Sequence, residues 1–140
     1  MNRDRERGQS LFEMASGLTV LLVLLAGLVD LGRAFFARVA LLDAAEEGAL
    51  YASYEPTDVY GIEGRIRDQS EGPVDFSDPS SVQVSVEYPE KGKACAGYTL
   101  RVVLDHEVTI ITPFLGAILG SQTIPLSVSS ESLILSPECP

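Results

Sequence analysis

The sequence predicts an α+β fold in which a long N-terminal helix packs on a small three-stranded antiparallel sheet. An apolar pattern of helical period runs without a breaker over residues 11–52. Three stretches of alternating apolar and polar residues follow, at 81–88, 98–110 and 124–135. One helical unit followed by a run of strands is typical of domains in which a helix covers one face of an antiparallel sheet.

The first half of the predicted helix is apolar enough to cross a membrane. Residues 14–29 carry no charge, and the run from 11 to 31 reaches the roughly 20 residues that span a bilayer core. A cleaved secretory signal is the alternative, but its apolar region is usually about 7–15 residues long and ends at a small-x-small site. The nearest such site, Gly32-Arg33-Ala34, lies inside the continuing helical pattern. A retained anchor is therefore favoured.

The second half of the helix is expected to pack on the rest of the domain. Its predicted apolar stripe consists of Leu31, Phe35, Leu42, Ala45, Ala49 and Ala52. Glu55-Pro56 ends the helix, because the residue before a proline avoids the helical region. A short second helix is expected over 58–69 with Thr57 as its N-cap, and 112–120 reads as an apolar connection with one helical turn.

Charge restricts the partners and the orientation. Residues 31–140 contain sixteen acidic and seven basic side chains, a formal charge of −9. A negative charge disfavours binding to nucleic acid or to an anionic lipid surface. The simpler interpretation is that the charge keeps an exposed head soluble. Arg3, Arg5 and Arg7 precede the span, against Arg33 and Arg38 after it, so the positive-inside rule favours a cytoplasmic N-terminus and an extracytoplasmic head.

One carboxylate, Glu13, lies near the start of the apolar run. A charge inside such a segment costs roughly 2.5–3.5 kcal/mol at the centre and less near the end, so a function is the first hypothesis. The alternative is that Glu13 faces headgroup water. The spacing resembles that of type IV pilin-like precursors, which are cut after a glycine and carry glutamate at the fifth mature position. Cleavage between Gly8 and Gln9 would make Glu13 the fifth residue.

Three stretches together resemble the TadE family of pilin-like proteins, components of tight-adherence (Flp-type) pilus systems. They are residues 7–13, residues 29–49 and residues 112–116, and the likeness is strongest over 7–52. The resemblance implies that Glu13 neutralises the α-amine of a neighbouring mature subunit, since paired charges are spared from lone burial in low dielectric. An N-terminal Gln9 can also cyclise, which would remove its own amine.

The resemblance also implies an organisation and a set of partners. Residues 1–8 would be a prepilin-type leader, 9–31 a transmembrane helix, and 32–140 an extracytoplasmic α+β head that includes the rest of the helix. The partners would be a prepilin-type peptidase, other pilin-like subunits and membrane lipid, with the chain in the plasma (inner) membrane. It would act in pilus assembly, adhesion or secretion by helix packing and head-domain binding. An unprocessed single-pass scaffold and an anchored ligand-binding domain are the alternatives.

Two further pairs of residues are candidates for structural roles. Asp30 and Arg33 lie three apart on the helix and either form an ion pair or mark the membrane boundary, which is the favoured interpretation. Cys95 and Cys139 are the two cysteines, and would lie at the same end of the sheet if the last two strands are antiparallel neighbours. A disulfide there could contribute about 4 kcal/mol, while an unpaired tail cysteine or an intermolecular bridge stays open.

No pattern in the sequence predicts catalysis, a metal or a cofactor. His106 is the single histidine, and alternation places it on the inward face of the second strand between Asp105 and Glu107. Such a histidine is usually a half-buried core residue. Two cysteines and one histidine at these positions do not match zinc-ligand spacing, and no phosphate loop, nucleophile elbow or dinucleotide fingerprint occurs.

Overall fold

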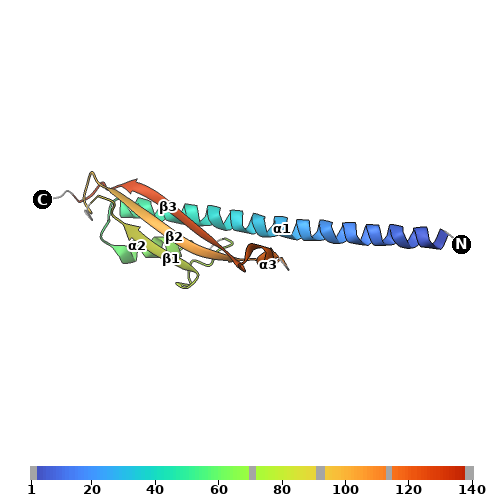
Figure 1. The fold of residues 1–140 in the computed structure, drawn as a ribbon. Helices are drawn as coiled ribbons and strands as arrows, with labels where there is room; N and C mark the ends of the chain where they lie inside the picture. The colour runs from blue at the N-terminus through green and yellow to red at the C-terminus, as the bar shows by residue number, and fades with distance from the viewer. Residues whose placement is uncertain (1–2, 70–71, 91–93, 113–114, 138–140) are drawn as a thin grey trace.

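The computed structural model describes residues 3–69, 72–90, 94–112 and 115–137, with side chains from residue 9 onward. Its elements are α1 (Arg3–Ala52), α2 (Val59–Arg67), β1 (Val82–Glu87), β2 (Thr99–Thr109), α3 (Leu115–Leu119) and β3 (Thr123–Leu133). The strands form one antiparallel sheet in the order β1-β2-β3. The C-terminal half of α1 lies along this sheet, and the N-terminal half projects away from the head (Figure 1). The predicted α+β fold is confirmed.

Helix α1 is longer at its N-terminal end than the sequence pattern predicted. It begins at Arg3 rather than at residue 11, since the arginines and glutamate before Gly8 are good helix formers even without an apolar face. At the other end, the backbone amide of Ser53 still reaches the carbonyl of Ala49 at 3.0 Å. A turn then leads to Glu55-Pro56, where the helix was expected to end.

The stripe by which α1 contacts the sheet is made mostly of small side chains. Its buried apolar members are Ala34, Ala37, Leu41, Ala44, Ala45, Ala49 and Ala52. The predicted stripe is therefore right for its three alanines and wrong for Leu31, Phe35 and Leu42, which are 64%, 62% and 40% exposed. Alanines allow the strands to lie close to the helix axis, so the large side chains point away from the head.

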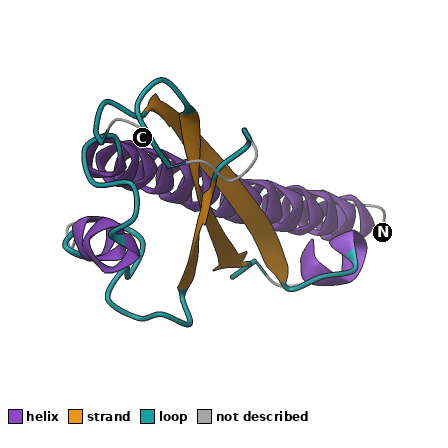
Figure 2. Ribbon diagram, turned by 90° about the vertical axis from the view of Figure 1, so that its left-hand side faces the viewer, coloured by secondary structure: helices purple, strands orange, loops and turns teal. Residues whose placement is uncertain are grey.

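Figure 2 shows the sheet lying along α1. The core lies between this stripe, the inner face of the sheet and α2, whose Ile62 and Ile66 are fully buried. Leu100, Val102 and Leu104 on the central strand are fully buried, as the alternation predicted. On the outer face the register places Glu87 opposite Arg101, and Arg101 opposite Glu131. The Arg101 guanidinium bonds Glu131 at 2.8 Å and lies 3.7 Å from Glu87, and the Glu131 carboxylate raises the pKa of Arg101.

Helix α2 is capped by Asp58, so the prediction of Thr57 as N-cap is wrong. One Asp58 oxygen accepts a hydrogen bond from the Gly61 amide at 3.0 Å, and the other accepts from the Tyr51 hydroxyl at 2.9 Å. The second bond ties the cap to α1 and raises the pKa of Tyr51. The two oxygens of the Asp58 carboxylate accept from two donors at once, one on α2 and one on α1.

The connection between β2 and β3 contains the predicted helical turn, α3. Gly120 follows it with φ +76°, a left-handed conformation that ends helices and that glycine adopts without strain. Residues 113–114 of the connection lie outside the described residues.

Candidate functional site

The N-terminal half of α1 has almost no contact with the rest of the chain. Large apolar side chains cover it and are at least 45% exposed: Leu11, Phe12, Met14, Leu18, Val20, Leu21, Leu22, Val23, Leu24, Leu25, Leu28 and Val29. In the described part of the chain, one helix is long enough and apolar enough to cross a membrane, and it is α1. An exposed apolar surface of this extent needs lipid or partner helices to cover it.

Gly8 and Gln9 are consecutive residues in this half of α1, and Glu13 lies about one turn further along. Glu13 is exposed, and its Oε1 accepts a hydrogen bond from Nε2 of Gln9 at 3.3 Å. The two residues are four apart and therefore neighbours on one face of the helix. Cleavage after Gly8 would leave the new α-amine of Gln9 about one helical turn, roughly 6 Å along the axis, from Glu13. The geometry is compatible with charge pairing at Glu13; the pairing itself stays a prediction.

Asp30 is the most buried polar side chain of α1 in the described chain, with 3% of its surface exposed. Its carboxylate accepts hydrogen bonds from the backbone amides of Ile111, at 3.1 Å, and Thr112, at 2.8 Å. The acceptor on the helix thus supplies partners to two amides just after β2 ends. Sequence reasoning missed this role.

Arg33 completes the junction between helix and sheet. Its Nη1 lies 3.4 Å from Oδ1 of Asp30 and donates a hydrogen bond to the carbonyl of Thr109 at 3.3 Å. The ion pair that the spacing allowed is therefore present. Whether the pair also marks the membrane boundary stays a prediction.

Cys95 is disulfide-bonded, and Cys139 lies outside the described residues, so their pairing stays a prediction. The neighbouring backbone supports it. The amide of Ala96 donates to the carbonyl of Pro137 at 2.7 Å, and that of Gly97 donates to Ile134 at 3.0 Å. The segment before β2 therefore lies against the segment that leads to Cys139.

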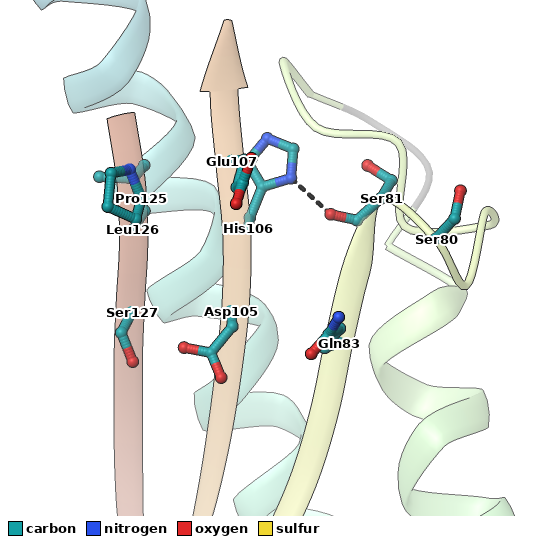
Figure 3. A pocket seen from close by; sticks show the side chains of 9 residues that line it. All are labelled: Ser80, Ser81, Gln83, Asp105, His106, Glu107, Pro125, Leu126 and Ser127. Atoms are coloured by element: carbon teal, nitrogen blue, oxygen red, sulfur yellow. Dashed lines mark hydrogen bonds between the residues drawn. The ribbon is translucent and has the colours of Figure 1, made fainter. Parts of the chain in front are cut away.

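An open depression of about 610 Å³ lies around His106 (Figure 3). His106 is half-buried on the inward face, as predicted, and its Nδ1 lies 2.7 Å from the carbonyl oxygen of Ser81. Asp105 and Glu107 are exposed beside it. Within the described ranges, no group of three or more His, Cys, Asp or Glu side chains could hold a metal ion.

The comparison with protein families agrees with this division into a helix and a head. The model of the family described as TadE-like protein matches residues 8–50. The chain contains a TadE-like domain. The matched segment starts at Gly8 and includes Glu13, Asp30 and most of the buried stripe of α1. No curated protein and no solved structure matches the chain.

The TadE-like match covers less than half of the chain and shows that residues 8–50 are similar to the corresponding segment of TadE-like proteins. The long apolar helix indicates a single-pass membrane anchor. The match stops near the end of α1, so the sheet and the His106 depression lie outside it.

Proposed function

We propose that the chain is a membrane-anchored, pilin-like subunit that takes part in assembling a tight-adherence pilus or a related secretion or adhesion apparatus. The observation that carries this proposal is the TadE-like match over residues 8–50, which coincides with an apolar helix that its own head leaves largely uncovered. The subunit acts by association, with the helix as its assembly surface and the acidic head presented outward.

The uncovered surface of α1 continues beyond the proposed span. Phe35 and Phe36 are 62% and 65% exposed and pack edge to face with ring centroids 6.0 Å apart. Val39 and Leu42 extend this surface along the head. Small residues face the chain's own sheet, and large apolar residues face outward. This division leaves the outward face for the helices of other pilin-like subunits.

Processing and topology complete the proposal. A prepilin-type peptidase removes residues 1–8, the helix over 9–31 stays in the membrane lipid, and the N-terminus faces the cytoplasm. Gly8 supports this role because a glycine lets a peptidase approach the backbone closely. Glu13 then pairs with the α-amine of a neighbouring subunit. An unprocessed membrane scaffold would share every other feature.

Site-specific photo-crosslinking in the native cells tests the proposed assembly surface. A photoreactive amino acid placed at Phe35 is expected to crosslink the chain to another pilin-like subunit of the same pilus system. Tyr60, which is 90% exposed on α2, serves as the matched control and is expected to give little or none of that product. Equal crosslinking from both positions, or none to a pilus component from Phe35, would contradict the proposal.

A further inference from the structure

Among the described residues of the segment that joins β2 to β3, three large apolar side chains are exposed. Ile111 is 68% exposed, and Ile118 and Leu119 on α3 are 79% and 58% exposed. We call these three residues the apolar tip. Clustered apolar side chains on a surface mark contact with a partner or a membrane.

The contacts of this segment place the apolar tip at the end of the head nearest the proposed span. Thr109 is bonded to Arg33, and Thr112 is bonded one turn nearer the N-terminus, to Asp30. Thr112 also lines apolar hollows with Ala26 and Val23. The chain therefore follows α1 toward its N-terminus as it leaves β2. In Figure 1, α3 lies at the end of the head that faces the projecting half of α1.

The part of the head that contains the apolar tip differs from the rest in having no charged side chains. The chain has 20 acidic and 10 basic side chains, yet none lies in the 23 residues between Glu107 and Glu131. An acidic head would be repelled by an anionic surface, but this part of it carries no charge to desolvate. Asp30 also satisfies the amides of Ile111 and Thr112 within the protein, which reduces the cost of placing them in a medium poor in water.

We propose that the apolar tip inserts into the lipid leaflet on the head's side of the membrane, as a second, interfacial anchor beside α1. This proposal rests on the membrane span proposed above. Two contacts with the bilayer, one through α1 and one through the tip, fix the tilt and rotation of the head relative to the membrane plane. A head held in this way presents the Phe35 side of α1 in a defined direction to arriving subunits.

Depth-dependent fluorescence quenching tests the proposal, because the native chain contains no tryptophan. The full chain is reconstituted in two sets of phosphatidylcholine vesicles, with acyl chains brominated near the headgroup in one and near the bilayer centre in the other, at a lipid excess that keeps copies apart. Ile118→Trp is the test variant. Leu22→Trp reports on the span, and Tyr60→Trp reports on a surface far from the tip; the native residues are 56% and 90% exposed.

Quenching of Ile118→Trp by the shallow bromines is expected to lie within about twofold of the quenching of Leu22→Trp by the deep bromines, since interfacial side chains reach roughly 5–10 Å into the leaflet. It is expected to lie at least about fivefold above the quenching of Tyr60→Trp by either lipid. An unquenched Ile118→Trp beside a quenched Leu22→Trp overturns the tip proposal and leaves the span intact. Absence of quenching in Leu22→Trp refutes the span, and the tip proposal with it. A blue-shifted but unquenched Ile118→Trp shows that the side chain is covered by the protein itself rather than by lipid, and also overturns lipid insertion.

Discussion

Replacing Glu13 by glutamine is expected to lower incorporation of the chain into pilus-associated assemblies at least about tenfold while leaving the chain in the membrane, because a positive charge then lacks its partner in low dielectric. Glutamine keeps the size of the side chain and its hydrogen-bonding capacity but removes the charge. The Gln9–Glu13 contact of 3.3 Å does not need that charge, so helix α1 is expected to remain intact.

The measurement is the ratio of chain in the isolated pilus fraction to chain in the membrane fraction, by quantitative immunoblot in native cells. Ser16→Ala is the matched control, because the Ser16 hydroxyl is also polar and exposed on this half of α1 and donates only to the Glu13 carbonyl at 3.0 Å. The control is expected to match the wild type. Normal incorporation of Glu13→Gln would show that the charge at this position is dispensable and that helix packing alone drives assembly.

Replacing Asp30 by asparagine is expected to weaken the hydrogen bonds that join α1 to the segment after β2. The carboxylate accepts from two backbone amides, and Arg33 lies beside it. Asparagine keeps one oxygen, which accepts from these amides only as a neutral and therefore weaker acceptor, and its NH₂ group replaces the oxygen that faces the Arg33 guanidinium. Amide hydrogen exchange at Ile111 and Thr112 is expected to accelerate by about tenfold or more, since local opening becomes easier.

Hydrogen–deuterium exchange of the full chain in lipid nanodiscs measures this effect. The amides of Val102 and Leu104, at the centre of the sheet, provide an internal reference that is expected to change little. Asp43→Asn is the matched control, since Asp43 is an exposed carboxylate on the same helix. Unchanged exchange at Ile111 and Thr112 in Asp30→Asn would show that these amides do not depend on the carboxylate.

The sequence predicted the strands well, because successive side chains of a strand point to opposite faces and the apolar residues therefore alternate with polar ones. The inward positions Leu100, Val102 and Leu104 follow from period two alone, and the structure buries all three. The apolar stripe of α1 was harder, because this helix is apolar on more than one face. A hydrophobicity pattern ranks Phe35 above Ala34, yet the sheet packs on the alanine and leaves the phenylalanine exposed.

Roles that depend on distant partners were not predictable from one sequence. Asp30 bonds amides 81 and 82 residues away, and nothing near it in the chain indicates which loop it holds. The sequence showed only a single carboxylate at the end of an apolar run. Such a residue indicates a functional or structural position but does not indicate which groups it binds. The choice of Asp58 over Thr57 as the cap of α2 likewise depends on Tyr51, which approaches only once α2 folds back against α1.

The central claim is that this chain is a processed pilin-like subunit, and the N-terminus of the mature protein tests it most directly. Intact mass and N-terminal sequencing of the chain extracted from its native membrane are expected to show a start at Gln9, or at its cyclised form, with residues 1–8 absent. A chain that keeps residues 1–8 would contradict prepilin-type processing and indicate a permanently anchored scaffold. A start after Ala34 would contradict the membrane anchor itself.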